Sequence, residues 1–69
     1  MSAIQSVTFP SDWTEKNCQD WLYDHGFTPI KKVHLTANRR RYRIAEPEYF
    51  DHYSTKVLPE GVELVIGYL

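Results

Sequence analysis

The sequence has little of what small domains usually use to reinforce a minor core. Cys18 is the only cysteine among 69 residues, so no disulfide forms within the chain. Cys18 and the three histidines also lack the C-x2-C and H-x3–5-H spacings that short chains offer to tetrahedral zinc. Aromatic residues, by contrast, make up 14% of the chain. We therefore expect aromatic packing, an oligomer or both to stabilise the domain.

No segment of the sequence is both long and apolar. A membrane-spanning helix needs roughly 18 consecutive apolar residues, and no run approaches that length. Residues 1–5 have neither the basic nor the apolar region of a signal peptide. A single thiol does not require an oxidising compartment. We expect one domain, residues 1–69, that is intracellular and makes no membrane contact.

Enzyme motifs are missing too. The sequence has no glycine-rich phosphate loop and no G-x-S-x-G nucleophile motif. Cys18 and His25 are expected on one helix, two turns apart, and about 10 Å is too far for a hydrogen bond between them. The acidic residues near His52 do not have the spacing of a calcium-binding loop. We expect a non-enzymatic protein with no catalytic residues, no metal site and no cofactor.

Local patterns in the first half of the chain predict a strand and a helix. Alternating apolar residues indicate a short strand over residues 4–9 that ends at Pro10. Thr14 is a suitable N-cap, and an apolar face follows at helical spacing. Gly26 is typical of the position just beyond a helix, so the helix is predicted over about 14–25.

A basic β-hairpin is predicted next. Its strands are residues 30–35 and 40–44, and a four-residue loop pairs Leu35 with Arg40. Strand alternation then gives one face that is mostly core and one that is basic. The basic face carries Lys32, His34, Arg41 and Arg43.

The remaining chain is predicted to complete a small sheet. Pro47 is suited to begin one helical turn in a connector over 45–53. Residues 55–58 and 62–69 are expected as strands joined by a turn, with the last strand covered on both faces. The fold class is α+β: one helix packed on a small, mostly antiparallel sheet of four or five strands, in the order β-α-β-β-(short turn or helix)-β-β.

Charge is distributed very unevenly along the chain. Six of the eight basic side chains lie between residues 31 and 43, and that segment contains no acid. A net charge of −1 therefore conceals a segment of about +6 and a remainder of about −7. We predict an interaction surface on the hairpin, formed by Lys32, His34, Arg39, Arg40, Arg41 and Arg43.

Two kinds of partner suit such a surface. One is an acidic protein surface, on another protein or on a second copy in a homo-oligomer. The alternative is nucleic acid, with the arginines on phosphates and Tyr42 stacked on a base. The chain is slightly acidic overall, whereas nucleic-acid-binding domains tend to have a pI above about 9. This balance favours a protein partner.

A spread-out pattern covers nearly the whole chain. It includes Trp21-Leu22…His25-Gly26-Phe27, Arg41-Tyr42-Arg43-Ile44 and Glu63-Leu64-Val65-Ile66-Gly67. This pattern resembles short proteins of unassigned role encoded by tailed phages and large DNA viruses. The resemblance implies a viral accessory or virion-associated protein, located in the host cytoplasm or the virion, that acts in assembly or binds a host factor. It brings no known catalytic residue.

Overall fold

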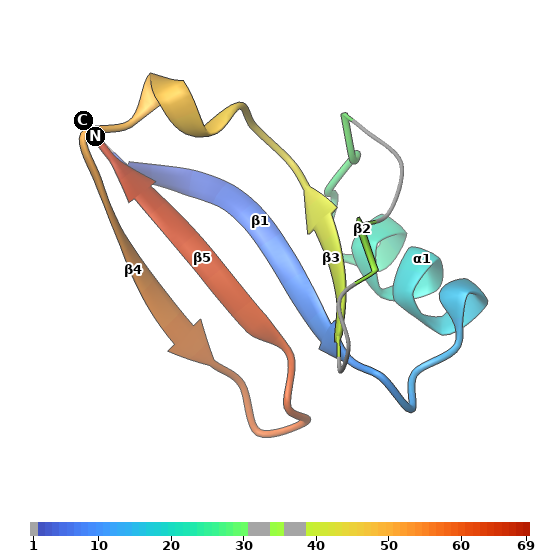
Figure 1. Ribbon diagram of the computed structural model, residues 1–69. Helices are drawn as coiled ribbons and strands as arrows, with labels where there is room; N and C mark the ends of the chain where they lie inside the picture. Colours follow the sequence, from blue (N-terminus) through green and yellow to red (C-terminus); the bar gives the residue numbers. More distant parts are fainter. Residues whose placement is uncertain (1, 31–33, 36–38) are drawn as a thin grey trace.

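A computed structural model of the protein describes residues 2–30, 34–35 and 39–69. Within this part of the chain it contains one α-helix and an antiparallel sheet, which confirms the α+β class. The elements along the chain (Figure 1) are β1 (Ser2–Pro10), α1 (Glu15–Asp24), β2 (His34–Leu35), β3 (Arg39–Arg43), the 3-10 turn η1 (Pro47–Tyr49), β4 (His52–Val57) and β5 (Glu63–Tyr68).

The strands form one sheet in the order β2-β3-β1-β5-β4. Every pair of neighbours is antiparallel. The central strand is β1, in which Val7 lies opposite Tyr42 of β3 on one side and Leu64 of β5 on the other. Ser2 pairs with Tyr68, so the two ends of the chain lie side by side (Figure 1).

Helix α1 begins and ends at the capping residues that were predicted from the sequence. The Thr14 hydroxyl accepts a hydrogen bond of 3.1 Å from the Asn17 backbone N–H, as an N-cap does. At the other end, Gly26 has a φ of +77°, and the Phe27 N–H donates to the Leu22 carbonyl at 2.8 Å. This is a Schellman motif. The predicted helix is therefore confirmed to within one residue at each end.

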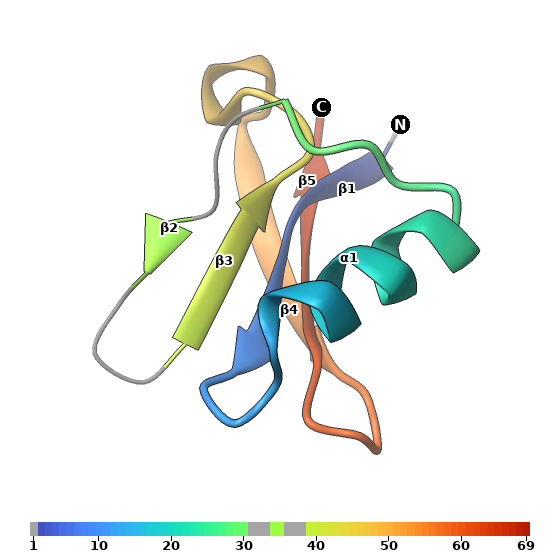
Figure 2. The same cartoon turned by 90° about the vertical axis from the view of Figure 1, so that its right-hand side faces the viewer.

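The core lies between α1 and one face of the sheet. Phe9 is its centre, because its ring contacts the rings of Trp13, Trp21 and Tyr42 at centroid distances of 5.2 to 5.6 Å. In Figure 1, α1 lies next to β3 and the end of β1, on the side of the molecule away from β4; in Figure 2, turned by 90°, α1 lies in front of the sheet. The buried apolar residues are Val7, Phe9, Cys18, Leu22, Tyr42 and Val62.

The β4–β5 hairpin is not covered in this way. All six residues of β4 are exposed, and most of β5 is only half-buried. The prediction that residues 62–69 are covered on both faces is therefore wrong, because the single ten-residue helix does not reach this half of the sheet. Strand β4 also begins at His52, earlier than the predicted 55–58.

The basic hairpin is described in part. Leu35 lies opposite Arg40, as predicted, and His34 opposite Arg41. Residues 31–33 and 36–38, which include Lys32 and the first three residues of the predicted loop, lie outside the described residues. The last loop residue, Arg39, instead begins β3. In the described part of the chain, no helix is both long enough and apolar enough to cross a membrane.

Candidate interaction surface

Strand alternation sorts the four arginines of β3 onto two faces of the sheet. Tyr42 is 3% exposed and packs under α1, so its neighbours Arg41 and Arg43 point to the opposite face. Arg39 shares that face, since it lies two residues before Arg41. We call this row of Arg39, Arg41 and Arg43 the arginine ridge. It crosses the sheet face that α1 leaves open.

Arg41 is held in place by neutral partners on β1. Its Nε donates to the Ser6 hydroxyl at 3.3 Å, and its Nη2 donates to Gln5 Oε1 at 3.2 Å. Gln5 is itself buried, and its amide nitrogen donates to the Ala45 carbonyl at 3.0 Å. A register shift in β1 between Ile4 and Ser6 places Gln5 at this point. Arg41 is thus oriented without being neutralised.

Arg39 already binds a carboxylate of the same chain. Its Nη1 lies 3.0 Å from Glu63 Oε2 on β5, across the intervening strand β1. The two side chains are 43% and 27% exposed. A partly exposed ion pair of this kind contributes only about 0–1 kcal/mol to stability. A partner carboxylate can therefore compete with Glu63 at little cost to the fold.

Arg43 is the ridge residue whose guanidinium has no partner among the described residues. It lies opposite Ser6 in the β3–β1 register and is half-buried. Its backbone carbonyl accepts a hydrogen bond from the Ile30 N–H at 2.9 Å. Its guanidinium makes no hydrogen bond or ion pair with any residue that the structure describes. This group remains available for a ligand outside the domain.

The structure separates Arg40 from the other predicted surface residues. Arg40 lies opposite Phe9 on the helix side of β3, and its Nε donates to the Trp13 carbonyl at 3.0 Å. Including Arg40 in the basic surface is therefore corrected: alternation turns its side chain toward the core. His34 is placed next to Arg41 in the backbone pairing. The ridge thus contains three of the predicted residues, and Lys32 lies outside the described residues.

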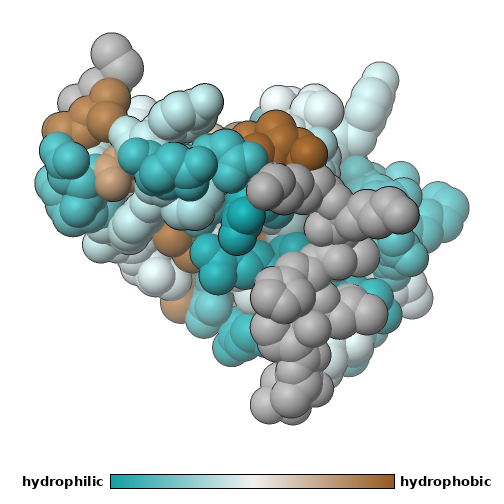
Figure 3. All heavy atoms as spheres, turned by 45° about the horizontal axis from the view of Figure 1, so that its top comes forward, coloured by the Kyte–Doolittle hydropathy of each residue, from teal (hydrophilic) through white to brown (hydrophobic). Residues whose placement is uncertain are grey.

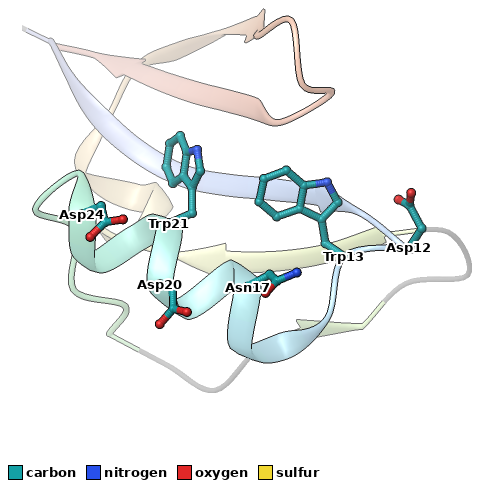
Figure 4. A pocket seen from close by; sticks show the side chains of 6 residues that line it. All are labelled: Asp12, Trp13, Asn17, Asp20, Trp21 and Asp24. Atoms are coloured by element: carbon teal, nitrogen blue, oxygen red, sulfur yellow. The ribbon is translucent and has the colours of Figure 1, made fainter.

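A groove on the opposite side of the molecule was not predicted from the sequence. It is an open hollow of about 540 Å³ beside α1, lined by Asp12, Trp13, Asn17, Asp20, Trp21 and Asp24. The two indole rings project to the same side, whereas the Asp20 side chain points away from them (Figure 4). Asp20 is also paired with Lys16 at 3.0 Å.

Among the described residues, no cluster of three or more His, Cys, Asp or Glu is placed to hold a metal ion.

Two titratable groups lie in the core near this groove. Burial raises the pKa of the Cys18 thiol and raises the pKa of Tyr42 to about 12. Cys18 is fully buried, so its thiol stays protonated and shielded at neutral pH. The Tyr42 hydroxyl is buried and has no hydrogen-bond partner among the described residues. Both groups act as apolar packing at neutral pH.

The described surface on one side of the molecule is mostly polar. In the view of Figure 3, hydrophilic residues dominate, and apolar residues appear in small separate groups. A broad apolar patch, which would suggest a hydrophobic docking site, is not seen on that side. The arginine ridge gathers three charges of one sign on one face of the sheet. No protein-family model, no curated protein and no solved structure matches this chain.

Proposed function

We propose that the protein is a small non-enzymatic binding module that contacts another protein through the arginine ridge. One observation carries this proposal: three arginines occupy successive outward positions of β3 on the open face of the sheet. Two residues of a strand span about 6.8 Å, so the Cα atoms of the three arginines form a regularly spaced row. Asp and Glu side chains on a partner strand or loop suit such a row.

Arginine chemistry favours a carboxylate ligand. A guanidinium forms two parallel hydrogen bonds to a carboxylate, which lysine cannot do. Arginine is also enriched among the residues that dominate protein interfaces. Because Gln5 and Ser6 already orient Arg41, this side chain loses little freedom on binding. The Arg39–Glu63 pair shows the same chemistry within the chain.

Nucleic acid remains the alternative ligand for the ridge. It is less well supported, since single-strand binders place aromatic rings beside the basic groove. Here the rings of Phe9, Trp13 and Trp21 are on the helix side of the sheet. Tyr42, expected to stack on a base, is buried there as well. A contact limited to phosphates is the form this alternative would take.

The resemblance to short viral proteins supports a more specific proposal. A viral accessory or virion-associated protein would use the ridge in virion assembly or in binding a host factor. Its location would be the host cytoplasm or the virion. Both roles need contact with an acidic protein surface, which belongs either to a partner or to a second copy of this chain.

The proposal is tested with the double variant Arg39→Ser/Arg43→Ser. Arg41 is left in place because it satisfies buried Gln5. The ligands are a peptide rich in Asp and Glu and a mixed-sequence single-stranded oligonucleotide. We expect the wild type to bind the peptide and the double variant to lose on the order of tenfold or more in affinity. Lys56→Ser is the control, because it removes one exposed charge from β4.

Two results would count against a protein partner. If the oligonucleotide binds, the peptide does not, and affinity falls steeply between about 50 and 500 mM salt, the ridge is a nucleic-acid site. If the double variant and Lys56→Ser both bind the peptide as well as the wild type does, the binding surface lies elsewhere. Circular dichroism of each variant confirms that the fold is intact.

A further inference from the structure

Strand β4 is an edge of the sheet with little protection. It is last in the strand order and pairs only with β5. Its residues are all exposed, with Tyr53 at 43% and Val57 at 61%. Edge strands are usually protected by proline, bulges or several charges. Over His52–Val57 the pairing with β5 is continuous, and Lys56 is the only residue that is always charged.

The pairing with β5 determines which backbone groups of β4 face outward. The Leu58 N–H donates to the Val62 carbonyl at 2.8 Å, in the same register that pairs Val57 with Glu63. In an antiparallel ladder, residues that exchange such bonds alternate with residues that do not. Ser54 and Lys56 therefore bond to β5. The N–H and C=O groups of Tyr53, Thr55 and Val57 point to the open edge.

We propose that two copies of the chain join through this edge. Strand β4 pairs antiparallel with β4 of the second copy about a two-fold axis, which gives one continuous sheet. Such an interface uses the same strand on both copies, as two-fold dimers require. Strand addition at a free edge is a recurrent mode of protein recognition. The ridge is on β3, beyond β5 and β1, so this inference does not depend on it.

One register of this pairing is self-complementary. With Thr55 opposite Thr55 of the second copy, Tyr53 lies opposite Val57, and this pair occurs twice. Aromatic–β-branched pairs and Thr–Thr pairs are among the favourable cross-strand pairs.

Lys56 on the other face of β4 disfavours one of the alternative registers. There Lys56 lies opposite Ser54 of the second copy. A shift of two residues one way would place Lys56 opposite itself, and the other way opposite His52. Like charges directly opposite each other are unfavourable, so the register that pairs Lys56 with itself is disfavoured. The register that pairs Lys56 with His52 would place Tyr53 opposite Thr55, so both Tyr53–Val57 pairs would be lost.

The first test changes the outward N–H at the centre of the interface. Thr55→Pro removes this donor, which β5 does not use, so the monomer keeps its sheet. We expect light scattering to give twice the 8.2 kDa chain mass for the wild type at high concentration and one chain mass for Thr55→Pro. Thr55→Val, which keeps the N–H, should remain dimeric. A monomeric wild type, or a dimeric Thr55→Pro with an unchanged circular dichroism spectrum, would overturn the proposal.

The second test probes the register by disulfide formation. In the proposed dimer the two Thr55 Cα atoms are about 5.5 Å apart, within reach of a disulfide. The two Lys56 residues are displaced along the strands and exceed the roughly 7 Å limit. We expect Thr55→Cys to form a covalent dimer at least tenfold faster than Lys56→Cys under mild oxidation. Cys18 does not compete, because it is fully buried. Equal rates, or a faster Lys56→Cys, would refute this register.

Discussion

The two halves of the sheet differ in what covers them. On β1, residues from Gln5 to Phe9 are buried, and on β4 every residue is exposed. Both strands lie in the same antiparallel sheet, but β1 is central and β4 is at the edge. Val7 and Phe9 of β1 belong to the core with α1, Ser6 and Thr8 lie opposite the ridge arginines on the other face, and α1 lies away from β4 (Figure 1). We infer that the covered half holds the fold together and that the open face and the free edge are available for contacts.

The largest expected contrast compares Phe9→Ala with Val57→Ala. Phe9 is fully buried, and its truncation should lower the free energy of unfolding by about 3–5 kcal/mol. Val57 is 61% exposed, and its truncation should change that free energy by no more than about 0.5 kcal/mol in the monomer. Urea denaturation measures both. Similar losses would mean that the hairpin half also carries the fold.

In the exposed half, the Phe50 ring lies close against Gly67. A Cβ added to Gly67 would clash with the Phe50 ring, so Gly67→Ala should displace the ring and cost about 1–3 kcal/mol. In the double variant Gly67→Ala/Phe50→Ala the clash is gone. The cost of Gly67→Ala should then be much smaller when measured against Phe50→Ala alone. If the cost is the same in both backgrounds, Phe50 does not restrict this position.

Tyr42 should make the covered half sensitive to high pH. Burial raises its pKa from 10 in the unfolded chain to about 12 in the fold, so the folded state holds this proton more tightly. The contribution of Tyr42 to the free energy of unfolding is therefore fully present below pH 10. It is lost as the pH rises toward 12, by up to about 1.4 kcal/mol per pH unit. Tyr42→Phe removes this contribution while costing little at pH 7, because the hydroxyl has no hydrogen-bond partner among the described residues. An unchanged slope between pH 10 and 12 in this variant would assign the titration to other groups.

The N-cap of α1 tests how much the covered half depends on its helix. Thr14→Ala removes the acceptor of the Asn17 N–H and should cost about 1 kcal/mol. Thr14→Asp keeps an acceptor and should restore most of that stability. The midpoint of thermal unfolding reports both changes. If Thr14→Ala leaves the midpoint of thermal unfolding unchanged, the packing of Cys18 and Leu22 alone holds the helix in place.

Local sequence signals predict where the helix begins and ends, but they do not predict how much of the sheet is covered. Thr14 and Gly26 act within a few residues of themselves, so the sequence alone places the helix ends. The extent of the sheet that ten helical residues cover depends on tertiary packing. No local pattern reports it, which is why the exposure of β4 and β5 was not predicted.

The arginine ridge and the groove could also be predicted only in part from the sequence. Strand alternation placed Arg41 and Arg43 on the basic face, whereas charge clustering alone added Arg40, which the structure places on the helix side. The groove beside α1 combines a loop with the helix, so a scan along the sequence does not reveal it. The anchoring of Arg41 by Gln5 depends on an irregularity in β1 that no residue pattern signals.

The role of the open face is tested most directly by the arginine Nε–Hε signals in an NMR titration with the Asp- and Glu-rich peptide. All four arginines of the chain lie in β3, so the spectrum reports both faces at once. We expect Arg43 to shift most, Arg39 and Arg41 to shift less, and Arg40, bonded to Trp13 on the helix side, to stay in place. Shifts centred on Arg40, or none at all at saturating peptide, would contradict binding through the arginine ridge.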